Sequence, residues 1–145
     1  MRRAALALGL SFLAIASACG ELKSPTEPIQ PPSEPDDPSA TFSRVQNEVF
    51  TPSCAFSGCH GAAAPQAGME LTEGVAYSNI VNVPSTEVPQ FDRVEPGRPE
   101  QSYLYLKITG SDQIIGSRMP LGQPELPEDE VELVRDWIAR GAPND

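Results

Sequence analysis

CAFSGCHG, residues 54–61, places a histidine directly after the second of two cysteines. Two cysteines followed at once by a histidine form the attachment pattern of c-type haem, whose usual spacer between the cysteines is two residues. The thiols bond to the porphyrin edge, and the adjacent imidazole binds the iron as the proximal ligand. The stretch therefore predicts one covalent haem c on Cys54 and Cys59, with His60 as its proximal ligand.

The spacer in this stretch has four residues, so part of it must loop out for both sulfurs to reach the haem. Gly58 suits such a loop because glycine tolerates left-handed backbone geometry. His60 is the one histidine of the chain, and its position beside the cysteine pair favours the haem interpretation. The alternative is a haem-free module in which a Cys54–Cys59 disulfide closes the loop.

A candidate distal ligand lies far downstream, at Met119. The neighbouring Gly116, Pro120 and Gly122 predict a loop there. A methionine thioether opposite the histidine is common in cytochromes c and raises the reduction potential. Met69 is the other internal methionine, and we expect it to pack under the haem edge or in the core. Arg118 is a candidate partner for a haem propionate.

The chain begins with an export signal. Arg2 and Arg3 precede an apolar run over 4–15, and small residues then lead to Cys19. This layout is typical of a secretory signal peptide. Residues 1–18 resemble a bacterial lipoprotein signal, which implies lipidation of Cys19 as the new N-terminus. The alternative is an ordinary cleaved signal that leaves Cys19 as a free thiol.

A linker is expected over 19–40, between the lipid-anchor cysteine and the folded domain at 41–145. Residues 21–40 hold six prolines and five acidic residues, so they offer little to a core and predict a disordered, extended tether. Removing the signal with its two arginines lowers the formal net charge from −10 to −12. Such a charge argues against nucleic-acid binding.

The domain itself reads as mostly helical with long loops. Thr41 is a candidate cap for a first helix that buries Phe42, Val45 and Val49 and that Pro52 ends. Shorter helices are expected over 72–80 and 101–108, the second stopped by Gly110. The clearest helix begins at Pro127 and carries an apolar stripe of Val131, Val134, Trp137 and Ile138, with Gly141 at its end.

Several short motifs follow one another in the order found in a known family. After the haem stretch come GMEL at 68–71, VEPG at 94–97, SYL at 102–104, RMP at 118–120 and WIARGA at 137–142. In this order the domain resembles the small cytochrome c-like domains of exported bacterial proteins, including those named for planctomycetes. The resemblance implies an all-α cytochrome c fold, with its closing helix packed against the first helix. It also implies the ligand set Cys54, Cys59, His60 and Met119.

These observations favour an electron carrier over an enzyme. One histidine and two available cysteines do not complete a structural zinc set, and no phosphate-binding glycine loop occurs. A haem peroxidase or sensor would need an iron from which Met119 is displaced. We expect a protein lipid-anchored to a bacterial membrane, facing the periplasm or cell surface, that exchanges electrons with other exported redox proteins and takes no small-molecule substrate.

Overall fold

A computed structural model describes residues 37–145. The predicted signal at 1–18, Cys19 and the linker up to residue 36 lie outside the described residues. Over the described part the regular structure is helical, and the β-pairs are three isolated bridges rather than strands. The helical segments are α1 (Phe42–Arg44), η1 (Val45–Phe50), α2 (Thr51–Ser53), η2 (Gln66–Gly68), α3 (Ala76–Ile80), η3 (Pro99–Gln101), α4 (Tyr103–Thr109) and α5 (Glu128–Ala139). The prediction of an all-α class is confirmed at this level.

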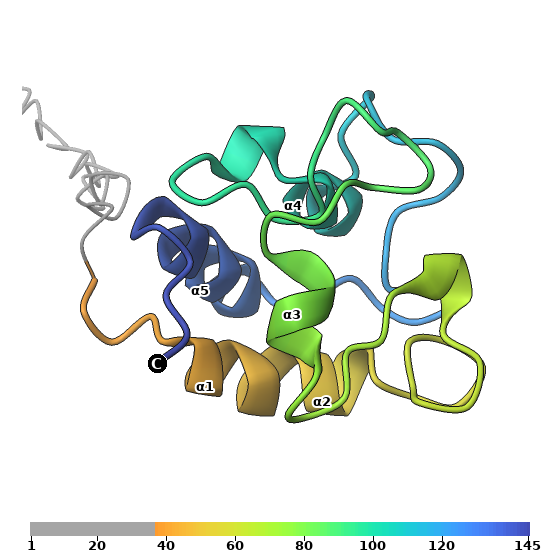
Figure 1. The fold of residues 1–145 in the computed structure, drawn as a ribbon, viewed down its shortest axis with the longest axis horizontal. Helices are drawn as coiled ribbons and strands as arrows, with labels where there is room; N and C mark the ends of the chain where they lie inside the picture. Colours follow the sequence, from red (N-terminus) through yellow and green to blue (C-terminus); the bar gives the residue numbers. More distant parts are fainter. Residues whose placement is uncertain (1–36) are drawn as a thin grey trace, which may run out of the picture.

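The first three segments follow one another without a break and form one N-terminal helix (Figure 1). Its predicted cap is confirmed, because the Thr41 side chain accepts the Arg44 N–H at 3.2 Å. The middle segment, η1, is a π-helix, in which the Thr51 N–H bonds to the Gln46 carbonyl five residues earlier. This wider turn brings Gln46 and Phe50 to the buried side together with the predicted Val45 and Val49.

The helix ends at Ser53, one residue after Pro52 and directly before Cys54, in agreement with the expected end before the cysteine pair. Proline lacks an N–H and its ring normally clashes with the carbonyl four residues earlier. The π-turn directly before Pro52 widens the helix and displaces that carbonyl, so the ring is accommodated. The helix therefore delivers its last turn to Cys54, whose N–H bonds to the Phe50 carbonyl at 2.9 Å.

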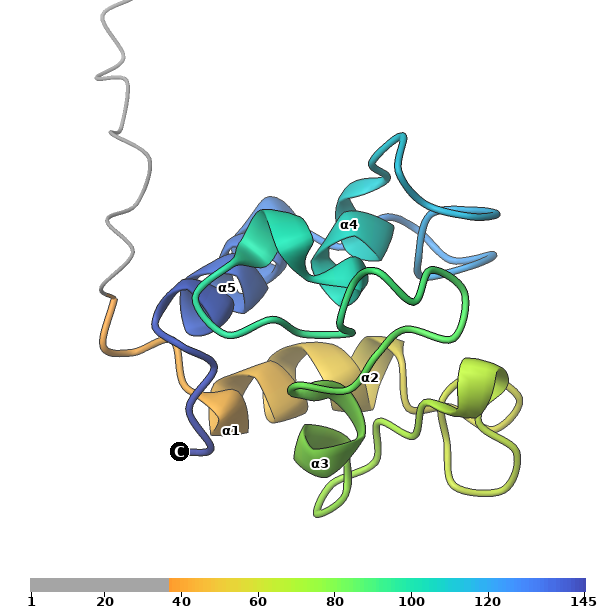
Figure 2. The ribbon, with the colours of Figure 1, turned by 45° about the horizontal axis from the view of Figure 1, so that its top comes forward.

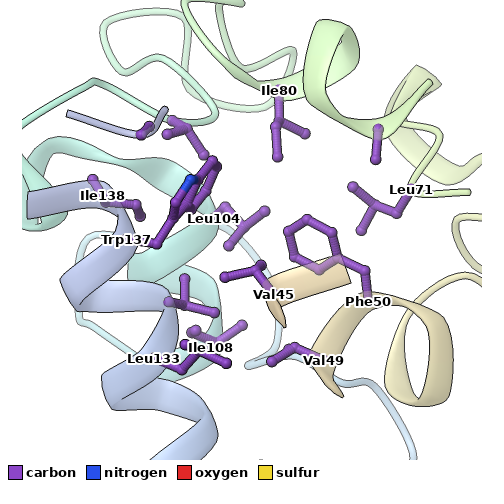
Figure 3. Close-up of a cluster of buried hydrophobic side chains, with 14 of the residues drawn as sticks. Val45, Val49, Phe50, Leu71, Ile80, Leu104, Ile108, Leu133, Trp137 and Ile138 are labelled. Carbon is purple, nitrogen blue, oxygen red and sulfur yellow. The ribbon is translucent and has the colours of Figure 1, made fainter. Parts of the chain in front are cut away.

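The core forms where α5 and α4 pack across the N-terminal helix (Figure 3). Val134, Trp137 and Ile138 of the predicted stripe are fully buried, and Val131 is partly buried. The Trp137 ring lies 5.4 Å from the Phe42 ring, centroid to centroid. The closing helix therefore packs against the first helix, as the sequence resemblance implies.

The two middle helices differ in how well the sequence predicts them. Leu104 and Ile108 of α4 are buried as expected, and Gly110 ends α4 in the left-handed conformation with φ 73°. The helix expected over 72–80 is shorter, since α3 begins at Ala76 and the residues before it form a turn. Val75 is 37% exposed, so it does not join the core.

The first and last described residues meet at one end of the molecule. The backbone carbonyl of Asp145 accepts the Ser43 N–H at 2.9 Å, and Arg140 donates to the Ala40 carbonyl at 2.6 Å. Ala40, the last residue of the predicted linker, is fully buried by this contact. The long loops that contain residues 54–61 and 116–122 lie at the opposite end of the molecule (Figures 1 and 2).

Candidate functional site

A cavity of about 460 Å³ lies between the loops and the helices. It is bounded by the end of the N-terminal helix, the loop of residues 54–60, one side of α4 and the loop around Met119. Its lining is mainly apolar and includes Phe50, Leu71, Leu104, Ile108 and Val134. A mainly apolar, concave space of this size is typical of a small-molecule or cofactor site, for which volumes of about 300–1,000 Å³ are usual.

All four residues predicted from the sequence to hold haem line this one cavity. Cys54, Cys59 and His60 come from the loop after α2, and Met119 comes from a loop some 60 residues later. Met69 also lines the cavity, in agreement with its predicted packing role. The fifth predicted site residue, Cys19, is outside the described residues.

The four-residue spacer folds back on itself, so both cysteines face the same cavity. The Phe56 carbonyl accepts the N–H groups of Cys59 at 3.0 Å and Gly61 at 2.9 Å, and the His60 N–H bonds to the Cys54 carbonyl at 3.2 Å. Gly58 has φ 84°, the left-handed geometry expected for it. These hydrogen bonds hold the four-residue spacer in a folded conformation, so both cysteines can line the same cavity in spite of its length.

Gly61 is a residue of this loop whose role the sequence did not indicate. It is buried, and a Cβ atom at this position would lie 2.8 Å from the Phe56 carbonyl oxygen. Only glycine allows the chain after His60 to pass this close to the spacer. The glycine that follows the histidine therefore closes the loop by its lack of a side chain.

The His60 ring is fixed by a backbone partner. Its Nδ1 lies 2.9 Å from the Met69 carbonyl oxygen. A carbonyl can only accept a hydrogen bond, so Nδ1 carries the proton and Nε2 keeps its lone pair. Burial lowers the pKa of His60, although its backbone hydrogen bonds act in the opposite direction. Burial thus favours a neutral imidazole, and the bond to Met69 leaves Nε2 as the nitrogen that can bind a metal, with the Gln66 backbone as a further neighbour of the ring.

The two cysteines are free thiols in this structure. Burial raises the pKa of Cys54 to about 12, and the nearby Glu130 carboxylate and Cys59 add to this effect. Glu130 itself is partly buried, and the pKa of its carboxyl is raised by burial and by Asp129 and Glu48. The Cys54 thiol is thus protonated at neutral pH.

Met119 is held in place through its backbone. Its N–H donates to the Lys107 carbonyl at 2.9 Å, which ties the Met119 loop to α4. Arg118, the candidate propionate partner, turns elsewhere. Its Nε donates to the Ile108 carbonyl at 2.7 Å, its Nη1 lies 2.8 Å from Glu125, and it is not among the cavity-lining residues. In this structure Arg118 is engaged at the end of α4 and with Glu125, and its pairing with a propionate stays a prediction.

Polar residues that the sequence did not single out also line the cavity. Lys107 is 7% exposed and its Nζ lies 2.8 Å from the Ile115 carbonyl, 3.3 Å from Glu87 and 5.7 Å from the centre of the Tyr103 ring. Burial raises the pKa of Tyr103. Lys107 shares a helical face with Tyr103 four residues earlier, so helical spacing could have indicated it. The second such residue is Arg93, which lies in a loop where no spacing indicates its position.

Comparison with known proteins gives no match: no family model, curated protein or solved structure is similar to this chain. Within residues 37–145, no set of three or more His, Cys, Asp or Glu side chains is grouped so as to hold a metal ion by itself. In the same range, no helix has the length and apolar character required to cross a bilayer.

Haem is compatible with the residues that surround the cavity. One wall supplies two thiols and an imidazole whose Nδ1 is bonded to the Met69 carbonyl, and a distant loop supplies a thioether. Histidine and methionine are the axial ligands that cytochromes c use. The apolar lining suits the porphyrin, and the set of side chains matches the chemistry of covalent attachment and six-coordinate iron.

Proposed function

We propose that this chain is a c-type cytochrome module that carries one covalent haem and transfers electrons between exported redox proteins. The observation that carries the proposal is the meeting of Cys54, Cys59, His60 and Met119 around one apolar cavity. Residues from two segments far apart in sequence converge there, and each is of the type that this cofactor requires. The helical class of the domain agrees with a cytochrome c-like fold.

Each residue has a defined task in this proposal. Cys54 and Cys59 would hold the haem covalently, and His60 and Met119 would serve as the ligands of its iron. The haem supplies an iron that cycles between two oxidation states. The bond from His60 Nδ1 to the Met69 carbonyl orients the imidazole and increases its basicity.

Electron transfer is favoured over catalysis on this site. If His60 and Met119 both served as iron ligands, the iron would keep no open position for a substrate. The chain has no second histidine to assist peroxide chemistry. A peroxidase or sensor would require Met119 to leave the iron, and a Met119 variant with an unchanged haem spectrum would favour that reading.

The location follows from the N-terminal sequence. We propose export by the signal at 1–18, lipidation at Cys19, and a Pro-rich acidic tether that ends before the buried Ala40 and holds the domain near a bacterial membrane. Two or more acyl chains give stable anchoring without a spanning helix. Loss of acylation in a Cys19→Ala variant, measured by the intact mass of the membrane fraction, tests the anchor separately from haem.

The central experiment is a haem stain of the denatured protein after expression with cytochrome c maturation enzymes. The wild-type band is expected to remain stained, and a Cys54→Ala/Cys59→Ala double variant is expected to lose the stain. Cys19→Ala is the matched control, since it removes a cysteine outside the loop and leaves the stain. An unstained wild-type band, with helical circular dichroism intact, would refute the proposal.

A haem-free module stapled by a Cys54–Cys59 disulfide is the second candidate. It is favoured by the four-residue spacer and by the hydrogen bonds that bring the two ends of the loop together. Its signature is a colourless protein whose mass is lower by two hydrogens than that of the reduced chain. The same purified sample therefore decides between the two candidates.

A further inference from the structure

The turn that carries the partner of His60 has an unfavourable backbone. Ala67 has φ 54° and Gly68 has φ 61°, so two successive residues adopt left-handed geometry. Glycine does this readily, but alanine does so at a cost because its Cβ crowds the following carbonyl. A non-glycine residue in this region persists only where surrounding contacts determine its conformation.

Arg93 supplies those contacts from a loop 26 residues downstream. Arg93 is 7% exposed, and its guanidinium donates to the carbonyls of Ala67 at 2.8 Å, Gly68 at 3.4 Å and Asn79 at 2.7 Å. Thr86 adds a second donor to the Ala67 carbonyl at 3.2 Å. One planar fork thus connects both left-handed residues of the turn to the end of α3.

Burial of this guanidinium is costly, and it lowers the pKa of Arg93. Among the described residues, no carboxylate forms a salt bridge with it. Its hydrogen bonds to the three carbonyls offset that cost. Arginine suits the task because its several N–H donors are fixed in one plane, whereas lysine offers a single donor centre.

The backbone of Met69 connects the turn held by Arg93 to the His60 ring. Met69 follows Gly68 directly, and its N–H bonds back to the Gln66 carbonyl at 3.0 Å. The carbonyl of the same Met69 accepts the proton of His60 Nδ1 at 2.9 Å. Any relaxation of the turn at Ala67 and Gly68 moves this acceptor away from the imidazole.

We propose that Arg93 is a positioning residue for the iron ligand: it fixes the turn whose Met69 carbonyl selects the Nδ1–H form of His60. This inference rests on the proposed function for its role toward iron, but the effect on the ring exists with or without haem. Arg93 touches no reacting atom in this account. It acts through the backbone of residues 67–69. Its positive charge also lowers the pKa of His60 directly, and Arg93→Lys keeps that charge, so the two effects can be separated.

The test follows the ring proton of His60 by NMR in the full-length protein as purified. The chain has one histidine, so the signal is unambiguous. In Arg93→Gln, hydrogen exchange at Nδ1 is expected to become roughly fivefold faster, the change in population that corresponds to weakening one hydrogen bond worth about 1 kcal/mol. Arg98→Gln is the matched control, because Arg98 is exposed and contacts only Gln101 through its side chain; no change is expected there.

Two further variants keep the test decisive. Thr86→Val removes the second donor to Ala67 from an exposed position, so the domain folds, and a smaller acceleration is expected. Arg93→Lys keeps the positive charge but loses the planar guanidinium donors. Hydrogen exchange at His60 Nδ1 should therefore remain almost as fast as in Arg93→Gln. Full restoration by lysine, or unchanged exchange in a folded Arg93→Gln protein, would overturn the inference.

Where haem is attached, the reduction potential gives a second readout. Loss of the bond to Met69 makes the imidazole a poorer donor, so the potential of Arg93→Lys is expected to rise. An unchanged potential in Arg93→Lys would contradict the role toward iron. Failure of the proposed function appears instead as an unstained band, while the ring-proton readout still applies to the haem-free chain.

Discussion

Gly61→Ala is predicted to disrupt the loop that presents both cysteines. The added Cβ would lie 2.8 Å from the Phe56 oxygen, 3.0 Å from the Phe56 carbonyl carbon and 3.1 Å from the Ala55 oxygen. All three are backbone atoms, so no side chain can rotate to make room. The spacer must therefore move away from the residue after His60.

The expected cost has two parts. Overpacking a filled site costs about 1–3 kcal/mol. The shift also weakens the hydrogen bond from the Gly61 N–H to the Phe56 carbonyl, worth about 1 kcal/mol. The free energy of unfolding should therefore fall by about 2–4 kcal/mol, a sum of these two principles. Urea denaturation followed by tryptophan fluorescence measures it, since Trp137 is the one tryptophan.

Gly74→Ala is the matched control. Gly74 has φ 84° with open space around its missing Cβ, so only the backbone cost of about 1–2 kcal/mol applies. After expression with maturation enzymes, the haem stain should decrease in Gly61→Ala and not in Gly74→Ala. A Gly61→Ala protein as stable as wild type, with full haem stain, would refute the reasoning from the close approach.

Three other perturbations test separate parts of the structure. Trp137→Ala should lower the free energy of unfolding by about 3–5 kcal/mol, as is usual for a fully buried aromatic ring, and calorimetry would expose a smaller loss as a sign that α5 does not anchor the core. In the haem-loaded protein, Met119→Ala should lower the reduction potential measured by redox titration, because a methionine ligand raises that potential. Met69→Ala alters another methionine of the same cavity and should change the potential much less. Equal effects of the two substitutions would argue against Met119 as the ligand. In the haem-free reduced protein, alkylation of Cys54 should be slow at neutral pH and accelerate up to a pH of about 12, because thiolate is the reactive form and burial raises the pKa of this thiol to about 12. Mass spectrometry of the labelled peptide follows the rate. A rate that reaches its plateau below pH 9 would contradict the burial of this thiol.

Local signals in the sequence predicted much of the helical framework. Thr41 caps the first helix, Gly110 ends α4, and the stripe of α5 is buried because helical spacing and end chemistry act over a few residues. The exceptions have local causes as well. Pro52 is accommodated by a π-turn that no sequence pattern indicates, and Val75 lies in a turn before α3 rather than on a helix.

The residues of the candidate site could be predicted only where a short local motif or loop pattern identifies them. Cys54, Cys59 and His60 form a motif, and Met119 lies in a visible loop. The role of Arg93 depends on carbonyls 25 and 26 residues away, and a carbonyl has no sequence signature. Gly61 matters through an atom that it lacks. Such contacts arise from tertiary packing and cannot be obtained from local pattern.

The contact between the two ends of the described chain has a mechanical consequence. Asp145 accepts from Ser43, and Arg140 donates to Ala40, while the loop of residues 54–60 lies at the far end of the domain (Figure 1). A pulling force applied through Asp37 therefore reaches these bonds before it reaches the loop of residues 54–60. These hydrogen bonds connect the N-terminal end of the domain to the residues that follow α5. Tension on the N-terminal side is therefore transmitted to α1 and α5 first, and the geometry around His60 is preserved.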